Sequence, residues 1–484
     1  MEPTVVDETV EQRSSSLRRG AIGTRHLVFF VVSAAAPLTV MAGFAPLAFL
    51  LGGQTAPVAY LVAGIVCAVF AVGFTAMSRY VQNAGAFYAY ITRGLGGTVG
   101  AGSAMVAYVG YTLGEIGFCS AAGLFASTAL DQLVGVTVSW GVCAVALGLI
   151  IAVVSYCRVD LGARVLAVLL LGEVGLLALL SAAILVKGAP EGLSLKGFDP
   201  STWSTSAMGS LFVITFVVYV GFEQTAVYAE EARDPRRTVP RATYIAVFLL
   251  AAVYTFTSWI LLMAIGPGAL ADALAGDPST LVFGINQQYL GTAATDVMLV
   301  LIVTSFFAGV LALHNAGSRY LFALGREGLL PARLAHTDPR SSSPTVAVVV
   351  QGVLVVGAVA AFGLSSLDPY TQVVIWTNTP TLVAVLVLQL LTSVAVIRFL
   401  GAHGSEDLWH RLIAPALSVV LIGAVLYLVC SKLSLLTGLG PVGNILINVP
   451  LIVAFVAGVV RAQVLKARRP EAFVRLGGGS PEAA

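Results

Sequence analysis

Long apolar stretches, one after another, are the feature that most limits how this chain can fold. A helix needs about 20 apolar residues to cross the hydrocarbon core of a membrane. Hydrophobic residues make up 58% of the chain and charged residues 10%, against roughly 25% charged in soluble domains. We therefore predict an all-α polytopic membrane protein with twelve transmembrane helices. The twelve stretches lie near residues 27–51, 57–78, 98–127, 135–157, 163–187, 208–231, 240–265, 288–321, 344–363, 371–398, 410–430 and 443–464.

The basic residues predict how these helices are oriented, because Lys and Arg are retained on the cytoplasmic side during insertion. With a cytoplasmic N-terminus, all 26 Lys and Arg residues except Lys187, Lys196 and Lys432 fall on the cytoplasmic side. We therefore expect a multi-pass protein of the cell membrane with both termini in the cytoplasm. The polar first 25 residues precede a full-length apolar stretch, which argues against a cleaved signal peptide.

Composition also excludes several kinds of partner and site. The net charge of +2 is too small to indicate a nucleic-acid partner. The five cysteines lie within or at the ends of predicted spans without ligand-like spacing, so we expect no disulfide framework, metal or cofactor. Residues 1–20 and 470–484 contain too few apolar side chains to offset the entropy of ordering, and we expect both to be disordered. One membrane domain would then span 21–465, between cytoplasmic tails 1–20 and 466–484.

Two of the apolar stretches carry residues that interrupt a helix. In the first, Pro37 lacks an amide hydrogen and crowds the carbonyl of Ser33, and Pro46 follows soon after. The sixth contains Gly221 and the ionisable Glu223. A carboxylate near the membrane centre costs at least ~2.5 kcal/mol, so it faces a cavity or a partner rather than lipid. Glycine eases unwinding, which a membrane tolerates only where the backbone lines a cavity or is packed in protein.

The spacing of these interruptions predicts an inverted repeat. They lie five stretches apart, an odd number, so two five-helix units must have opposite orientations in the membrane. Gly/Pro-interrupted helices at matching positions of inverted halves indicate a transporter's central binding site. We expect repeat one over about 27–187, repeat two over about 208–398, and accessory helices over about 410–464. The alternative is that Pro37 and Pro46 merely kink a packed helix.

Three motifs at predicted cytoplasmic helix ends carry a family resemblance. The first comprises Gly221, Phe222 and Glu223, the acidic pair Glu230 and Glu231, and the exit residues Pro235, Arg236, Pro240, Arg241 and Ala242. The second lies in residues 83–96, with Ala84, Gly85 and Tyr88, and the third in 316–331, with Arg319, Arg326, Gly328 and Pro331. With these motifs the chain resembles the amino acid, polyamine and organocation (APC) superfamily over nearly its whole length between the tails.

The resemblance implies a secondary transporter that moves an amino acid or related amine by alternating access. No GxxxxGK[ST] motif is present, which favours an ion gradient or exchange as the energy source. Proton symport is our first hypothesis, and exchange of amino acids or polyamines is the second. Many members hold the substrate's carboxylate with a Gly-x-Gly in the first helix, where this chain has Ala34, Ala35, Ala36 and Pro37. That departure weakens the assignment of an ordinary α-amino acid as substrate.

Broken helices can satisfy both ends of a zwitterion, because helix N-termini suit an anion and unwound carbonyls suit a cation. The candidate substrate-binding residues are Ser33, Ala36, Pro37, Thr39 and Gly43 in the first helix, and Phe216, Tyr219, Gly221, Phe222 and Glu223 in the sixth. Phe216, Tyr219 and Phe222 are candidate aromatic gates. For each of these three, plain helix packing is the alternative.

Three carboxylates lie at membrane depth: Glu115, Glu173 and Glu223. Burial disfavours the charged form of a carboxyl, which lets it exchange protons near neutral pH. Glu173 is the first candidate for ion coupling, because the resemblance places it where some proton-coupled relatives have a lysine in place of a sodium ion. A helix-to-helix hydrogen bond and contact with a substrate amine are its alternatives. Glu115 is the second candidate, with structural hydrogen bonding favoured, and the resemblance implies that Glu223 holds the unwound segment or inner gate.

The roles of other polar residues, and two other classes of protein, remain as alternatives. Ser305, His314, Asn315, Trp376 and Asn378 either line the path or form helix-to-helix hydrogen bonds. We expect His314 to be packed or interfacial rather than a proton relay. A multi-span membrane enzyme would need clustered His or paired Asp, and none of the five histidines pairs with another at helical spacing. A sensor that conducts nothing is the remaining alternative.

Overall fold

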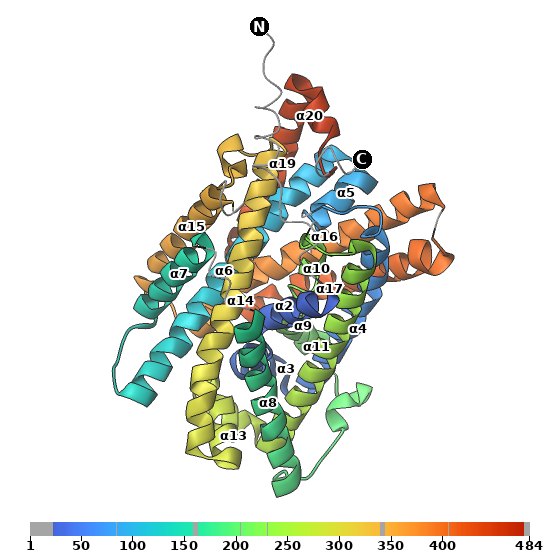
Figure 1. Ribbon diagram of the computed structural model, residues 1–484. Helices are drawn as coiled ribbons and strands as arrows, with labels where there is room; N and C mark the ends of the chain where they lie inside the picture. Colours follow the sequence, from blue (N-terminus) through green and yellow to red (C-terminus); the bar gives the residue numbers. More distant parts are fainter. Residues whose placement is uncertain are drawn as a thin grey trace.

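A computed structural model describes residues 23–83, 85–157, 163–203, 205–229, 231–338, 344–404 and 406–478. The regular elements in these ranges are helices (Figure 1). Ala84, Glu230 and the tail over 1–20, all named in the sequence predictions, lie outside the described residues. The helices are α2 (Thr24–Ala35), α3 (Ala45–Gly52), α4 (Ala56–Met77), α5 (Phe87–Leu95), α6 (Gly97–Val134), α7 (Trp140–Tyr156), α8 (Ala163–Lys187), α9 (Thr205–Val217), α10 (Gln224–Val227), α11 (Pro235–Ile265), α12 (Leu270–Leu274), α13 (Leu281–Leu290), α14 (Thr292–Arg326), α15 (Thr345–Gly363), α16 (Val374–His403), α17 (Ala414–Ser431), α18 (Leu433–Thr437), α19 (Pro441–Arg468) and α20 (Pro470–Val474).

The helices agree with the predicted spans. Each of the twelve predicted stretches coincides with at least one helix. In the described ranges, 9 helical segments are long and apolar enough to cross a membrane, while α2, α7 and α9 contain shorter apolar segments. The prediction of an all-α polytopic membrane protein is therefore confirmed. The count of twelve spans and the inverted repeat stay predictions.

Residues at the helix ends explain several of the boundaries. Ser139 begins α7, because its side chain accepts a hydrogen bond from the amide of Val142. Gly135 ends α6 in the left-handed conformation, with φ 72°; its amide donates to the Asp131 carbonyl, and the Val136 amide donates to the Leu130 carbonyl. Asp368 accepts hydrogen bonds from two backbone amides at the start of the segment that leads into α16. These local signals stop and start helices at the ends of the spans.

Glycines let α6 and α16 pack closely. A Cβ added at Gly110 would lie 2.7 Å from the Cβ of Ala384, and one at Gly114 would lie 3.0 Å from Thr381. Small residues of this kind allow membrane helices to approach each other where no hydrophobic effect drives association. Helix α6 also packs against α14, and α7 and α15 lie together beyond that pair (Figure 1). Helix α6 is thus central to the bundle.

The C-terminal segment differs from its prediction. We expected residues 470–484 to be disordered, whereas residues 470–478 form α20 and a turn that pack against the membrane domain. Leu476 is 3% exposed, and the amide of Gly477 donates a 3.1 Å hydrogen bond to the carboxylate of Glu327. Two apolar side chains, Phe473 and Leu476, lie against Gly97 at the start of α6, and Gly477 lies against Thr92 of α5. The expectation of disorder is wrong for this part.

Candidate functional site

The first predicted interruption is a break after α2. The helix ends at Ala35, and Ala36 adopts the left-handed conformation with φ 46° and ψ 71°. The Ala36 amide still closes the end of α2 by donating to the carbonyls of Ser33 and Val32, but Pro37 has no amide hydrogen to continue the pattern. The chain then resumes as a helix whose Thr39–Phe44 part is π-helical. The Ala35 carbonyl, freed by the break, accepts a 2.9 Å hydrogen bond from the Tyr254 hydroxyl.

The second interruption follows α9, which ends at Val217. Residues 218–223 form turns, with Gly221 at φ 120°, before α10 begins at Gln224. Only glycine adopts such a φ easily. The Glu223 carboxylate accepts a 2.9 Å hydrogen bond from the Gly221 amide and another from the Tyr111 hydroxyl. Glu223 is 0% exposed, so its buried side chain stabilises the unwound segment through these two hydrogen bonds.

The two interrupted helices run next to each other in opposite directions. Helix α3, after the first break, packs against α9, before the second. Helix α2, before the first break, packs against α10, after the second. Phe30 of α2 stacks on Tyr228 directly after α10, with ring centroids 5.9 Å apart. The first half of each helix therefore contacts the second half of the other.

Glu173 lies at the first break. One of its carboxylate oxygens accepts hydrogen bonds from the Ser305 hydroxyl at 2.8 Å and the Leu38 amide at 3.4 Å. The Ser305 oxygen accepts in turn from the Thr39 hydroxyl at 3.0 Å. Glu173 is 3% exposed, and no cationic side chain of the described residues forms an ion pair with it. A carboxylate so placed needs a proton or a bound cation to offset its burial.

Glu115 has partners of a different kind. Its two oxygens contact His314 Nδ1 and Gln351 Nε2, each at 2.7 Å. The three side chains come from α6, α14 and α15, and their side-chain hydrogen bonds among the described residues involve no residue of either break. His314 is 1% exposed, in agreement with a packed residue. Glu115 therefore has an ionisable partner, His314, within the helix bundle, whereas the hydrogen-bond partners of Glu173 are uncharged.

The other predicted site residues are all buried and lie around the two breaks. The Gly43 carbonyl accepts a 2.7 Å hydrogen bond from the Tyr370 hydroxyl. The Ser33 hydroxyl is buried without a hydrogen-bond partner among the described residues.

The three predicted gate aromatics pack rather than face each other. Phe216 packs edge-to-face on Phe212, with centroids 5.3 Å apart. The Tyr219 hydroxyl donates to the Tyr60 carbonyl of α4 at 2.8 Å, and Phe222 contacts Phe70, also of α4.

A small cavity of about 20 Å³ lies beside the second break. It has room for about one water molecule. Val217 and Val220 of the interrupted helix line it, together with Gly114, Phe118, Gln224, Leu313, Asn378 and Thr381. Sequence reasoning named Asn378 as a candidate path residue but missed the others. Gln224 had a usable signal, since it is an uncharged amide next to Glu223 in an apolar span, whereas Phe118 and Leu313 had none.

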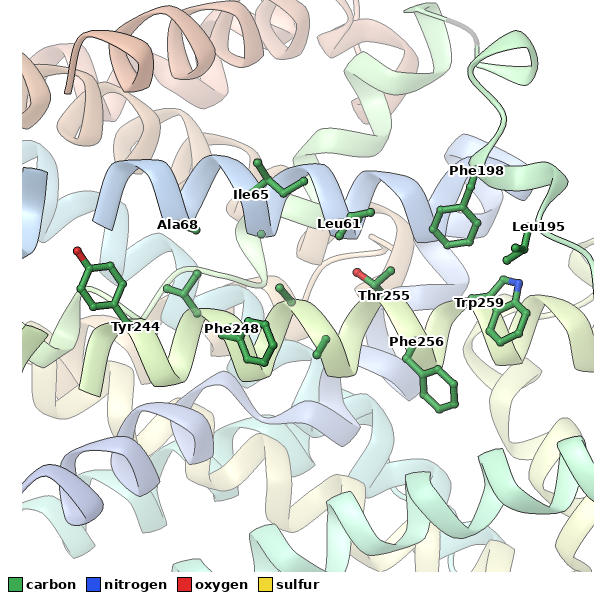
Figure 2. A pocket seen from close by; sticks show the side chains of 14 residues that line it. Leu61, Ile65, Ala68, Leu195, Phe198, Tyr244, Phe248, Thr255, Phe256 and Trp259 are labelled. Atoms are coloured by element: carbon green, nitrogen blue, oxygen red, sulfur yellow. The ribbon is translucent and has the colours of Figure 1, made fainter. Parts of the chain in front are cut away.

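A larger hollow lies on the outside of the bundle. This groove of about 760 Å³ runs between α4 and α11, and Figure 2 shows Leu61 and Ile65 on one side of it with Phe248, Phe256 and Trp259 on the other. Its walls are almost entirely apolar, with Ile65 52% and Phe248 77% exposed. Such exposed apolar side chains on a membrane-spanning bundle suit contact with lipid. The breaks, and not this groove, therefore stay the candidate site.

Comparison with known proteins gives concordant results. A family model described as "Amino acid permease" matches residues 22–470. The branched-chain amino acid permease BcaP of Lactococcus lactis subsp. cremoris is 30% identical over 151 residues, 30% of this chain and 31% of that protein. The Asc-type amino acid transporter 1 of Mus musculus is 32% identical over 151 residues, 31% of this chain and 27% of that protein. An uncharacterized transporter of Mycobacterium bovis is 28% identical over 320 residues, 60% of this chain and 63% of that protein. In each of these relatives the matched part is less than two thirds of the protein's length.

Proposed function

This chain belongs to the amino acid permease family, and we propose that it is a secondary active transporter that carries an amino acid or related amine across the cell membrane by alternating access. The resemblance to the APC superfamily is confirmed at the level of the family. The observation that carries the proposal is the pair of interrupted helices, packed side by side in opposite directions inside a membrane-spanning bundle. Both named relatives above are amino acid carriers by name, which supports an amino acid as substrate.

The proposed architecture has twelve spans, with two inverted five-helix repeats, two accessory helices and both termini in the cytoplasm. Two observations support it. Every predicted span coincides with a helix, and the contacts of α2 with α10 and of α3 with α9 are those that two inverted copies would make. Alternating access then consists of movement of the interrupted helices against the rest of the bundle.

The proposed substrate site lies between the two breaks. Carbonyls released at the end of α9 suit an ammonium group, and the helix that resumes after Pro37 presents its N-terminal amides to an anion. The contributing residues are those predicted from the sequence, namely Ser33, Ala36, Pro37, Thr39, Gly43, Phe216, Tyr219, Gly221, Phe222 and Glu223. All of them are buried in this conformation, so binding requires one side of the site to open.

The proposed coupling ion is a proton carried by Glu173. Its carboxylate is buried, has no cationic partner among the described residues and contacts both Leu38 at the break and Ser305 of α14. Loading or loss of a proton there changes the hydrogen bonds of the first break directly. Glu115 is the weaker candidate because its carboxylate already pairs with His314. Exchange of amino acids or polyamines is the alternative mechanism, and a membrane enzyme or a non-conducting sensor is the alternative class.

Uptake into proteoliposomes tests this proposal. Purified protein is screened with labelled amino acids and polyamines, with and without an inward proton gradient. We expect gradient-driven accumulation of at least one amino acid. Failure to accumulate or exchange any of them would favour the sensor.

The variant Glu173→Gln separates coupling from carriage. The amide keeps the size and hydrogen-bonding capacity of the carboxyl but cannot exchange a proton. We expect accumulation to be abolished while counterflow exchange is partly retained. Glu115→Gln, which breaks the pair with His314, should reduce accumulation and counterflow together through loss of stability. Equal loss of both activities in Glu173→Gln, or of neither, rejects the coupling role.

A further inference from the structure

We propose that the groove between α4 and α11 binds an anionic phospholipid, with Arg241 holding the headgroup phosphate and an acyl chain lying along the groove. Such a site lies outside the two breaks and does not depend on the proposed transport function. It is carried by the shape of the groove, by an arginine on the groove's own helix face that has no carboxylate partner, and by the uncharged lining.

The shape of the groove follows from small residues in its floor. A Cβ added at Gly64 of α4 would lie 2.5 Å from the Cβ of Ala251 of α11, so the two helices approach closely there. Larger apolar side chains flank this floor: Leu61 and Ile65 on α4, and Phe248 and Phe256 on α11 (Figure 2). The resulting volume of about 760 Å³ is within the range of roughly 300–1,000 Å³ that ligand sites commonly have. The hollow is therefore built into the way α4 and α11 pack.

The groove is long enough for an extended acyl chain. Tyr244 lies at one end of it and Trp259 at the other (Figure 2). Between them α11 rises roughly 22 Å, against about 30 Å for a whole hydrocarbon core. The Thr75 hydroxyl of α4 donates a 3.1 Å hydrogen bond to the Tyr244 hydroxyl, which ties the two helices together at that end. Tyr and Trp favour the membrane–water interfaces, so both ends of the groove suit the headgroup regions.

Arg241 extends the groove-lining face of α11 beyond Tyr244. Tyr244 and Phe248 follow it by three and seven positions, a spacing that places side chains on one face of a helix. Arg241 is exposed, and it forms no ion pair among the described residues. The acidic side chains that flank this end of α4 and α11 have other partners, namely Asp234 with Arg237, Glu231 with Arg319, and Glu406 with Arg79. Arg241 therefore presents an unpaired charge at the mouth of the groove.

The chemistry of the groove indicates the class of lipid. No residue of α4 is charged, and α11 has no charged residue after Arg241. Lipid tails are as apolar as the groove, so burial of an acyl chain gives little net gain over the surrounding bilayer. Selectivity must then come from the headgroup, whose phosphate a guanidinium can bind through two hydrogen bonds. A zwitterionic headgroup offsets that phosphate with its own ammonium, whereas an anionic headgroup leaves it for the arginine.

Native mass spectrometry of the purified protein tests the proposal, because it measures the affinity of individual bound lipids. Palmitoyl-oleoyl phosphatidylglycerol is compared with palmitoyl-oleoyl phosphatidylcholine, which has the same acyl chains. We expect the anionic lipid to bind at least about fivefold more tightly. Glycerol phosphate, which has no acyl chain, should not displace it. Equal binding of the two lipids, or displacement by glycerol phosphate, would overturn the proposal.

Two arginine variants test the headgroup contact. Arg241→Gln should lower the affinity for phosphatidylglycerol to that for phosphatidylcholine. The matched control is Arg236→Gln, since Arg236 is also exposed at this end of α11 but lies about 140° around the helix from Arg241. It should bind as the wild type does. The retention of basic residues at one side of the membrane accounts for both arginines, so only a bound headgroup predicts a difference between them.

Two tryptophan variants test the acyl-chain contact. Ala252 lines the groove between Phe248 and Phe256 and is exposed, so Ala252→Trp fills the groove without entering the core. We expect it to weaken phosphatidylglycerol binding at least about fivefold, whereas Ala424→Trp, at an exposed alanine of α17 away from this groove, should have no effect. Unchanged affinity in Arg241→Gln or in Ala252→Trp would overturn the proposal, as would equal losses in a variant and its control. These measurements need no transport, so a negative result in proteoliposomes leaves the lipid site unaffected.

Discussion

The left-handed conformation of Ala36 makes a prediction that two neighbouring substitutions can test. Ala36 has φ 46° and ψ 71°, whereas Ala35 is the last residue of α2. A left-handed conformation costs an L-residue about 1–2 kcal/mol, and glycine is largely free of this cost. Ala36→Gly should therefore relieve strain, and Ala35→Gly should not.

The comparison isolates the backbone contribution. Ala35 and Ala36 are 5% and 1% exposed, so each substitution removes one buried methyl and adds the same freedom to the unfolded chain. For Ala35→Gly we expect a loss of roughly 2 kcal/mol, from about 1 kcal/mol of helix propensity and about 0.8 kcal/mol of apolar burial. For Ala36→Gly the relief of about 1–2 kcal/mol offsets most of that loss. The two free energies of unfolding should differ by about 1–2 kcal/mol, with Ala36→Gly the more stable protein.

Equilibrium unfolding by sodium dodecyl sulfate in mixed micelles, followed by circular dichroism, measures this difference. The wild type and both variants are compared at the same protein and detergent concentrations. If Ala36→Gly is destabilised as much as Ala35→Gly, or more, then Ala36 is not the strained residue that terminates α2. The account of the first break would then be wrong.

Two further predictions concern the packing of α5 at Gly94 and the docking of the C-terminal segment. Gly94→Ala should sharply reduce the yield of monodisperse protein, because a Cβ there would lie 2.4 Å from the Ala395 carbonyl oxygen, while Gly401→Ala, with nothing within 4 Å of its Cβ, should not. Docking of residues 470–478 should weaken as pH rises, because burial raises the pKa of the Glu327 carboxyl and its ionisation within the contact becomes costly. Tyr88, Asn83, Arg326 and the Gly477 amide face this carboxyl, and Glu327→Gln should remove the pH dependence. A spin label at Val474→Cys in a cysteine-free background would report it, and equal mobility at all pH values in the wild type would contradict it.

The breaks could be predicted from the sequence because their causes are local. Proline removes a donor wherever it lies, and glycine in an apolar span permits a conformation that other residues avoid. The residue at which the first helix stops could not be predicted, because nothing in the sequence around Pro37 shows that Ala36 would take the left-handed conformation. The prediction named both interrupted helices, and the structure added which residue in the first one is strained.

The partners of the buried polar residues could not be predicted in the same way. Glu173 and Ser305 are 132 residues apart, and Glu115 and His314 are 199 apart. Their pairing depends on how the helices pack, and sequence periodicity does not contain that information. Asn378 illustrates the same limit, since its Oδ1 atom is buried without a hydrogen-bond partner among the described residues and no sequence pattern indicates that. The C-terminal segment was misjudged because its few apolar residues pack on the start of α6, beside α5, and the sequence does not show that this surface is there.

The contact between Glu173 and Leu38 connects the absence of a Gly-x-Gly in the first helix with the proposed proton coupling. Leu38 supplies one of the first free amides of the resumed helix, where an anion is favoured. In this conformation the Glu173 carboxylate accepts a hydrogen bond from that amide, which the proposed mechanism assigns to the substrate's carboxylate. A protonated Glu173 is a weaker acceptor and gives up the amide more readily. Under the proposed mechanism, the Glu173 carboxylate and the substrate's carboxylate therefore compete for the Leu38 amide. Protonation of Glu173 releases this amide to the substrate, which couples proton binding to substrate binding without a Gly-x-Gly in the first helix.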